Sequence, residues 1–416
     1  MIDTGRRFET RALHGDEVAE RNEANHNALR FPVYAGVAFD FATAEDMELA
    51  FTHRKPAHAY SRITNPTVEH FEKKLTLLEG GLTTVALSSG MAALTAALLA
   101  LLKQGDNLVA SKFLFGNTYS LLKETLSGYG IEARFVDTAD YGRLEAAIDG
   151  DTRLLLMETI SNPQMVVPDF VKIAKLARER QLILMVDGTA TTPYLFPAKE
   201  FGVHVIIHST TKFISGGATS VGGAIVDLGT YDWRRCPALA KFHRYGQGAF
   251  IARLRMEVHR NFGACMAPQA ASLQTLGLET LALRVRTSCA NALTLAEYLR
   301  QRPEVRSVNY PGLADSPFHE AAKRQFNGYF GGVLSFELAG RHEPFRLINN
   351  LRLIRRATNI NDNKSLIIHP ASTIFADCSR EEKAEMGVTE GLIRLSVGIE
   401  HPADLIDDLG RAFGAL

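Results

Sequence analysis

Two short apolar runs, each ending abruptly in polar residues, constrain this chain most. Residues 182–187 read LILMVD, and residues 203–212 read VHVIIHSTTK. Such runs are typical of buried strands in an open parallel sheet, whose carboxyl ends line the crevice where ligands bind. The first run therefore brings the carboxylate of Asp187 to that edge. The second run brings the hydroxyl groups of Ser209 and Thr211 and then the amine of Lys212.

An acid, two hydroxyl donors and a lysine at one sheet edge suit pyridoxal 5'-phosphate (PLP). A lysine can hold this cofactor as a Schiff base, and a carboxylate can pair with its ring nitrogen. The same residues also fit a buried strand end followed by a solvated lysine. These two segments alone leave both interpretations open, so the decision rests on the remainder of the chain.

Strand and helix patterns alternate over a long stretch that surrounds these two runs. The predicted strands are 83–87, 107–111, 132–136, 153–157 and 223–226, and the predicted helices are 91–102, 117–126, 144–148 and 168–180. This alternation predicts an α/β fold with a doubly wound, mostly parallel sheet. We expect the large domain to span residues 59–255.

The two ends of the chain have a different character. Residues 1–58 are polar and irregular, with a charged run near 17–23, and we expect an N-terminal arm there. Mostly helical segments after residue 250 precede strands predicted at 305–309, 333–338 and 393–397. Helices gathered against a small sheet predict a smaller C-terminal α+β domain, which we place at residues 256–416.

The composition excludes several classes of function. The 416 residues include 46 basic and 46 acidic side chains, and this balance argues against nucleic-acid or membrane-surface partners. The four cysteines form no CxxC pair, so neither a zinc site nor a disulfide framework is predicted. The N-terminus has no apolar segment typical of a signal peptide, and the longest mainly apolar stretch is too short to span a bilayer. We expect a cytoplasmic protein.

Several single motifs are ambiguous. Tyr60 and Arg62 fit a surface turn or an anion clamp, and the small-residue turn 88–90 before a helix fits a phosphate site. His204 and His208 lie four apart on a strand and need not converge on one atom, so no metal site is predicted. Glu158 fits an orienting role better than a catalytic one. A nicotinamide dehydrogenase is disfavoured, because no GxGxxG follows the first strand.

Together, however, the motifs form one ordered set. They are YSR at 60–62, NPT at 65–67, SSGM at 88–91, ETISNP at 158–163, Asp187, HSTTK at 208–212 and IRLSVGIE at 393–400. This set resembles the Cys/Met-metabolism family of fold-type-I PLP-dependent enzymes over nearly the whole chain. The resemblance implies a mostly parallel seven-stranded sheet flanked by helices, with the cofactor bound to the large domain.

The resemblance also implies a role for each matching residue. Lys212 matches the Schiff-base lysine that also moves protons, and Asp187 matches the partner of the pyridine nitrogen. The implied cofactor contacts are Tyr60, Arg62, Ser89, Gly90, Met91, Phe115, Asp187, Ser209, Thr211 and Lys212. The implied substrate contacts are Asn162, Asn359 and Arg394, the last gripping the α-carboxylate. Since the family supplies Tyr60 and Arg62 from a neighbouring subunit, we expect a homotetramer built from dimers that share active sites.

Three stretches are most similar to the O-acetylhomoserine sulfhydrylases within this family. They are GLETLALR at 277–284, VNYPGL at 308–313 and SLIIHPASTIF at 365–375. The implied reaction is γ-replacement in sulfur amino-acid biosynthesis, in which O-acetylhomoserine and sulfide or a thiol give homocysteine or methionine and acetate. Cystathionine γ-synthase, a γ-lyase and a catalytically silent PLP-binding protein remain as alternatives.

The chain departs from the family pattern at three places. Phe115 replaces the tyrosine that usually stacks on the cofactor ring; it can still stack but has no hydroxyl group for proton transfer. The segment NIND at 359–362 replaces Ser-Leu-Gly, and Gly217 replaces a common histidine. We predict activity despite these changes.

Overall fold

The computed structural model describes residues 5–15, 25–339 and 342–416. The larger of its two sheets has seven strands in the order β1-β7-β6-β5-β4-β2-β3. The strands are β1 (Thr83–Leu87), β2 (Asn107–Ser111), β3 (Glu132–Val136), β4 (Thr152–Glu158), β5 (Ile183–Asp187), β6 (Val205–His208) and β7 (Gly223–Asp227). Only β7 runs against the others, since it pairs antiparallel with both β1 and β6. The predicted mostly parallel, seven-stranded sheet is confirmed.

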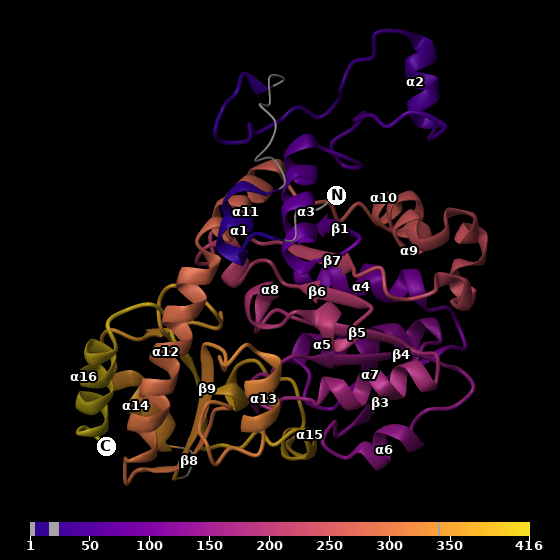
Figure 1. The fold of residues 1–416 in the computed structure, drawn as a ribbon. Helices are drawn as coiled ribbons and strands as arrows, with labels where there is room; N and C mark the ends of the chain where they lie inside the picture. The colour runs from indigo at the N-terminus through magenta and orange to yellow at the C-terminus, as the bar shows by residue number, and fades with distance from the viewer. Residues whose placement is uncertain (1–4, 16–24, 340–341) are drawn as a thin grey trace.

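Both faces of this sheet are covered, as its strand sequences require. Successive residues of β4 alternate between two hydrophobic clusters, with Leu155 and Met157 on one face and Leu154 and Leu156 on the other. The helices around the sheet are α3 (Pro66–Glu79), α4 (Gly90–Leu101), α5 (Gly116–Ser120), α6 (Tyr141–Ala146), α7 (Phe170–Glu179), α8 (Thr192–Leu195), α9 (Ala249–Arg253), α10 (Arg260–Phe262) and α11 (Pro268–Glu279). Figure 1 shows the sheet at the centre of this layered arrangement.

Local signals set the ends of the helices that matter for the site. Asn65 caps α3, because its side chain accepts from the backbone N–H of Thr67, and Pro66 occupies the first turn. The helix ends at Gly80, whose φ of 63° suits a left-handed C-cap. The predicted helix 117–126 begins as α5 and continues as a π-helical turn, η3 (Leu121–Leu126), so the 3.6-residue period breaks there.

A second sheet, of five strands, lies beside the first and is drawn in orange to yellow in Figure 1. Its strands are β8 (Val305–Asn309), β9 (Val333–Leu338), β10 (Arg355–Arg356), β11 (Leu366–Ile368) and β12 (Leu392–Ser396). Its helices are α12 (Leu281–Arg300), α13 (His319–Gln325), α14 (His342–Asn350), α15 (Arg380–Glu385) and α16 (Pro402–Phe413). The smaller α+β unit is thus confirmed, whereas β10, β11, α13 and α15 were not predicted.

Helix α12 joins the two units. Its first half packs on the core of the large sheet through Leu281 and Val285, and its second half packs on the core of the small sheet through Leu295 and Leu299. The boundary at residue 256 stays a prediction. None of the helices among the described residues is long and apolar enough to cross a bilayer.

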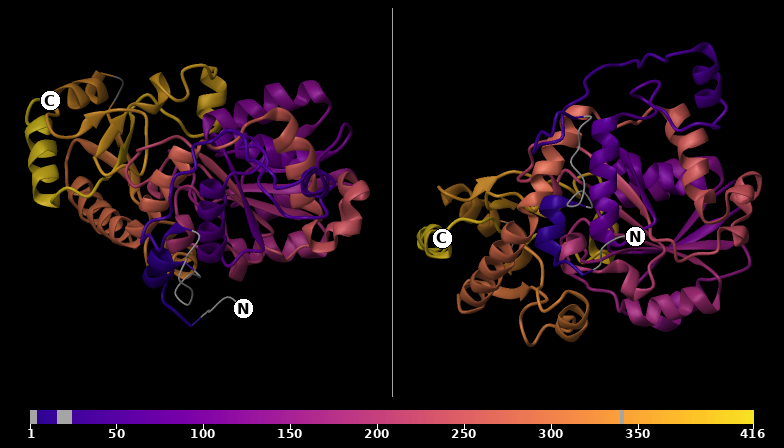
Figure 2. Two further views of the ribbon diagram at one scale, coloured as in Figure 1. Left: turned by 90° about the horizontal axis from the view of Figure 1, so that it is seen from above. Right: turned by 45° about the horizontal axis from the view of Figure 1, so that its top comes forward.

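The N-terminal segment carries α1 (Phe8–His14) and α2 (Ala44–Phe51), which the polar sequence did not predict. Helix α1 lies against α3 and α11, whereas α2 stands away from the body of the chain, as Figure 1 and the right view of Figure 2 show. Helix α2 has no buried residue. The charged run predicted within the arm lies mostly at positions 16–24, which are outside the described residues.

Candidate active site

A cavity of about 660 Å³ opens at the carboxyl edge of the large sheet, where the small sheet meets it. It brings together residues that are far apart in the sequence. The predicted site residues that line it are Gly90, Met91, Phe115, Asn162, Asp187, Ser209, Lys212, Asn359 and Arg394. Tyr60, Arg62, Ser89 and Thr211 are not among its lining residues.

One end of the cavity is formed by the start of α4. The hydroxyl group of Ser89 caps this helix by accepting from the backbone N–H of Ala92 at 3.0 Å. A Cβ atom at Gly90 would lie 2.6 Å from the Cβ of Ser209, so only glycine allows the helix to approach Ser209 this closely. The positive end of the helix dipole and the Ser209 hydroxyl group therefore face the same space, which suits a phosphate.

The hydroxyl group of Thr211 has another use. Its Oγ1 donates to the carbonyl oxygen of Gly222 and accepts from the N–H of the same residue, each at 3.1 Å. This pair of bonds closes the connection between β6 and β7 beneath Ser209. The predicted phosphate contact of Thr211 stays a prediction.

Two half-buried carboxyl groups lie side by side on the cavity wall. Glu158 ends β4 and Asp187 ends β5, and the two residues are register partners. Asp187 accepts from the N–H of Thr189 at 2.9 Å, and Glu158 accepts from the N–H of Phe115 at 2.7 Å. Burial raises the pKa of Asp187, and burial together with the nearby charge of Asp187 raises the pKa of Glu158 well above its usual range.

Within the described ranges, no ion pair reaches either carboxyl group. A buried carboxylate without a cation is unfavourable, and a cationic ligand would relieve this cost. The protonated ring nitrogen of PLP is a cation of the required kind, so Asp187 fits the group that the sequence predicted there.

Lys212 follows β6 and faces the same cavity. Its Nζ donates to the Oδ1 of Asn359 at 2.5 Å. Burial, and secondly the charge of Arg394, lower the pKa of Lys212 to about 8. Much more of the amine is therefore neutral near physiological pH than in an ordinary lysine, and attack on the cofactor aldehyde requires the neutral form.

Arg394 on β12 provides the cation of the site. It is only 1% exposed, and burial lowers the pKa of its guanidinium to about 9. Its Nη2 donates to the carbonyl oxygens of Thr358 at 3.2 Å and Asn359 at 2.9 Å, while its Nε has no partner in the described part of the chain. A buried guanidinium with an unused donor suits a carboxylate ligand.

These features together fit PLP. The start of α4 suits the phosphate, Asp187 suits the ring nitrogen, Lys212 suits the aldehyde, and the ring of Phe115 lines the same cavity. When bound, PLP would supply an electron sink, which none of the twenty side chains provides.

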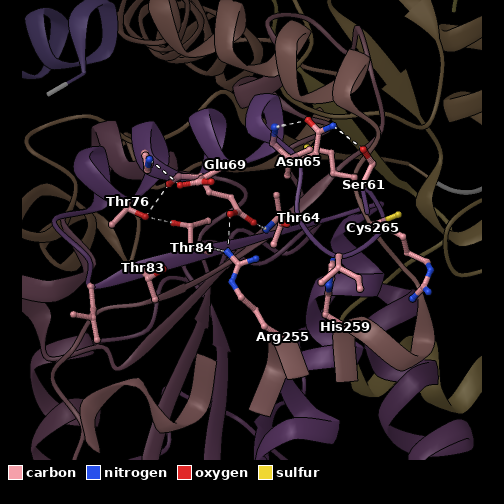
Figure 3. Close-up of a pocket in the computed structure, with 18 of the residues that line it drawn as sticks. Ser61, Thr64, Asn65, Glu69, Thr76, Thr83, Thr84, Arg255, His259 and Cys265 are labelled. Carbon is pink, nitrogen blue, oxygen red and sulfur yellow. Dashed lines mark hydrogen bonds and ion pairs between the residues drawn. The ribbon is translucent and has the colours of Figure 1, made fainter. Parts of the chain in front are cut away.

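Tyr60 and Arg62 lie elsewhere, beside a second cavity of about 370 Å³ lined by α3, β1 and the π-helical turn η9 (Leu254–His259). Arg62 donates to the carbonyl oxygen of Arg260 at 2.6 Å, and its guanidinium lies 5.5 Å from the Tyr60 ring centroid. Figure 3 shows Arg255 extending into this cavity toward Thr84, and the guanidinium also pairs with Glu72 at 2.6 Å. Because no lysine accompanies Arg62 at a strand end there, this cavity does not reproduce the predicted site.

The structure adds residues that the sequence did not single out. Thr189 donates its backbone N–H to Asp187, and its Oγ1 accepts from the N–H of Ser209 at 2.8 Å, so it links the two strand ends. The carbonyl oxygen of Thr358 receives Arg394, and Asp362 receives the amide of Asn359. The polar turn after Asp187 and the Asn-rich segment 359–363 were the only sequence signals for them.

Gly217 and Asn363 fit each other. Asn363 donates its Nδ2 to the carbonyl oxygen of Gly216 at 3.0 Å. A Cβ at Gly217 would lie 2.3 Å from this Nδ2, and Gly217 has a φ of +118° that other residues rarely adopt. The Asn363 side chain therefore fills the space in which a histidine at 217 would begin.

We expect Gly217→Ala to destabilise the loop after Lys212 by about 1–3 kcal/mol, because the backbone conformation and the contact with Asn363 both oppose a side chain. The thermal unfolding midpoint and the retention of PLP on dilution should both fall. Gly150→Ala is the matched control, since a Cβ there meets nothing within 4 Å. Equal behaviour of the two variants would show that Gly217 is not constrained.

His204 lies directly before β6 and is partly buried, whereas His208 ends the strand and is fully buried; both rings are hydrogen-bonded. His204 accepts from the N–H of Leu184 at 2.9 Å, and the Nε2 of His208 lies 2.5 Å from the Oε1 of Glu79. Their rings make separate contacts, as a strand rather than a helix predicts.

Comparisons with known proteins agree with this site. Residues 9–414 match the model of a family described as Cys/Met metabolism PLP-dependent enzyme. The O-acetyl-L-homoserine sulfhydrylase 1 of Thermus thermophilus is 38% identical, over 98% of this chain and 99% of the relative. The L-methionine gamma-lyase of Pseudomonas putida is 37% identical, over 98% and 97% respectively.

A solved structure from Campylobacter jejuni has a TM-score of 0.93 and 35% sequence identity, and the match covers 98% of this chain and all of the other. That protein is provisionally named an O-acetylhomoserine (thiol)-lyase, and its structure contains pyridoxyl-lysine 5'-monophosphate. The predicted fold type and the predicted cofactor are both confirmed.

Proposed function

Because the chain belongs to the Cys/Met metabolism family of PLP-dependent enzymes, we propose that it catalyses γ-replacement on O-acetylhomoserine. The Cγ–O bond of the substrate breaks and acetate leaves with the electron pair, while sulfide or a thiol forms a Cγ–S bond. The products are homocysteine or methionine, and acetate. One observation carries the proposal: Lys212, Asp187 and Arg394 line a single cavity in a chain whose full-length relatives include a sulfhydrylase for this substrate.

Each residue then has a distinct task. Asp187 keeps the cofactor ring nitrogen protonated, and the start of α4 with Ser209 holds the phosphate. When bound, PLP supplies an electron sink for negative charge at the substrate Cα. Lys212, once its amine is free and neutral, takes the proton from Cα and then one from Cβ. Phe115 has no hydroxyl group that could carry a proton, so we assign both proton transfers to Lys212.

Arg394 positions the substrate by its α-carboxylate. Its unpartnered Nε–H and its positive charge would hold the carboxylate in one place and so orient Cα toward Lys212. Asn162 also lines the cavity, and its Oδ1 has no partner among the residues described. Asn359 uses its Oδ1 on Lys212 and one N–H on Asp362, which leaves its second N–H for the predicted contact with the substrate carboxylate.

We expect Arg394→Lys to raise the KM for O-acetylhomoserine by about 10²-fold with a smaller change in kcat, because a lysine offers a point charge instead of a planar fork. Steady-state kinetics with a saturating level of sulfide would measure this. Arg411→Lys, which changes an arginine on α16 that pairs with Asp408 outside the cavity, is the control. A similar loss in both variants would remove Arg394 from substrate binding.

The function is tested by product analysis. Purified protein loaded with PLP is incubated with O-acetylhomoserine and either sulfide, cysteine or no nucleophile. Homocysteine with sulfide supports the proposal, whereas cystathionine with cysteine indicates a γ-synthase. A 2-oxo acid with no nucleophile indicates a γ-lyase, the activity named for the Pseudomonas putida relative. A stable loaded protein that forms no product would be a silent binding protein.

We further propose that two chains share their active sites within a homotetramer. Tyr60 is 40% exposed and lies outside the cavity of its own chain. The segment before it exposes the apolar side chains Leu29, Val33, Val37, Met47 and Phe51. A second copy of the chain is a partner that would cover them.

The four free cysteines support a reducing compartment, which we take to be the cytoplasm.

Subunit mixing tests the shared site. Arg62→Ala and Lys212→Ala each inactivate the site to which they belong, so neither homo-oligomer should turn over substrate. If Arg62 acts on the neighbouring chain, a mixed dimer contains one intact site, and activity should reappear after the two variants are unfolded and refolded together. No recovery in a verified mixed oligomer would place Arg62 in its own chain's site.

A further inference from the structure

The loop from Thr358 to Asn363 contacts β12 and the turns that follow β5 and β6. Carbonyl oxygens of this loop accept from Arg394, and the N–H of Asn361 donates to Ser396 at 2.7 Å. The Nδ2 of Asn361 donates to the carbonyl oxygen of Thr189 at 3.4 Å. On its other side, the loop contacts Lys212 through Asn359.

The amide of Asn359 lies between two charged groups. Its Oδ1 accepts from the Nζ of Lys212 at 2.5 Å, and its Nδ2 donates to the Oδ2 of Asp362 at 3.3 Å. A lysine ammonium can only donate, and a carboxylate can only accept. This pair of neighbours therefore allows one orientation of the amide, with its oxygen toward the lysine.

Asp362 is itself held in place. Its Oδ1 accepts from the backbone N–H of Lys364 at 3.1 Å, which leaves Oδ2 for Asn359. We propose that Asp362 is a positioning residue for the lysine of the active site: it orients the Asn359 amide, whose oxygen then holds the amine of Lys212. This inference rests on the proposed function only for the identity of the lysine, and it concerns the free amine.

The proposal has an electrostatic consequence. The groups around Lys212 are Asp187 and Glu158 at the strand ends, Arg394 on β12 and Asp362 in the loop. Arg394 lowers the pKa of Lys212, whereas Asp362 and Asp187 raise it, against the larger effect of burial. Removal of the Asp362 charge should therefore let the lysine lose its proton at a lower pH.

Asp362→Asn tests the proposal with little change in shape. Asparagine can still accept from Lys364 with its oxygen, but its N–H2 group then faces the Nδ2 of Asn359. Two donors repel, so the Asn359 amide turns over and presents its own N–H2 group to Lys212. The ammonium loses its acceptor, and the neutral amine can bond to this N–H2 group only through the lone pair with which it must attack the cofactor.

The readout is the rate at which the full-length chain, stripped of its cofactor, reloads with PLP between about pH 6 and about pH 9.5. Absorbance of the lysine-linked cofactor follows the reaction, which requires no turnover. The wild-type rate should rise with a midpoint near 8, as Lys212 loses its proton. For Asp362→Asn we expect a plateau about fivefold lower, equivalent to one ordinary hydrogen bond, and a midpoint at lower pH.

Asp377→Asn is the matched control, because it removes an exposed carboxylate from the same domain. It should keep the wild-type plateau and midpoint. A folded Asp362→Asn variant that keeps the wild-type plateau and midpoint would overturn the proposal. A lower plateau with an unmoved midpoint would also overturn it, because that result indicates a merely structural role. If Asp362→Asn does not fold, Asn359→Leu makes the same test, since an unchanged plateau there removes the amide from the mechanism.

Failure of the two proposals can be told apart. A chain that makes no homocysteine but shows the shifted reloading curve in Asp362→Asn keeps the positioning role and loses the sulfhydrylase function. A chain that makes homocysteine but shows identical reloading curves in all variants keeps the sulfhydrylase function and loses the positioning role of Asp362.

Discussion

Lys212→Ala is expected to lower the turnover of O-acetylhomoserine by at least about 10³-fold and to remove the covalent link to PLP. Alanine offers no amine for the link and no base for the Cα proton, and general-base catalysis alone accounts for about 10²–10⁴ in rate. Homocysteine formation measures the first loss. The second is measured by borohydride reduction of the loaded protein, which should fix PLP to the wild type only.

Lys199→Ala is the matched control for this substitution. Lys199 donates to the carbonyl oxygen of Gly80 at 2.9 Å and lies outside the cavity. This variant should retain both turnover and the covalent link. A Lys212→Ala protein that kept wild-type turnover would invalidate the assignment of the catalytic lysine and, with it, the proposed mechanism.

Asp187→Asn is expected to lower kcat by about 10²–10³-fold while the chain still folds and binds PLP. Asparagine keeps an oxygen that can accept from the N–H of Thr189, so the strand end is preserved. It has no negative charge, however, and cannot keep the ring nitrogen protonated, and loss of one such electrostatic contact typically costs this much. Single-turnover kinetics would place the loss in the proton-transfer steps.

Asp227→Asn is a control of the same chemistry. Asp227 is another aspartate at a strand end, where it is buried and accepts from the N–H of Gly229 at 2.8 Å and from the indole N–H of Trp233 at 3.0 Å. Burial raises its pKa to about 6, but it does not line the active-site cavity. This variant should keep its activity, and equal losses at 187 and 227 would point to general damage of the sheet.

Much of the fold could be predicted because a strand can be recognised from a few consecutive residues. Strands predicted at 83–87, 107–111, 132–136, 305–309 and 333–338 have the same bounds in the structure. Each is a short run rich in apolar residues that ends at polar ones, so neighbours in the chain suffice to define it. The two- and three-residue strands β10 and β11 were missed, because runs this short have no detectable period.

The helices were harder to delimit. Residues 117–126 have helical spacing, yet the chain passes from α5 into the π-helical turn η3. Helix α6 begins at Tyr141, three residues before the predicted start at 144, because Asp140 caps it by accepting from the N–H of Arg143. Caps depend on a single side chain, whereas periodicity requires several turns.

By itself, the sequence determined the layered sheet, the order of the strand-end motifs and the family to which they point. These properties depend on residues that are close together in the chain. Only the tertiary structure showed that Asn359 reaches Lys212 across 147 positions, that Asp362 accepts from its amide, and that Gly217 makes room for Asn363. Such contacts join segments that are far apart in the chain where the two sheets meet, and no local pattern of hydrophobicity or charge encodes which side chains then face each other.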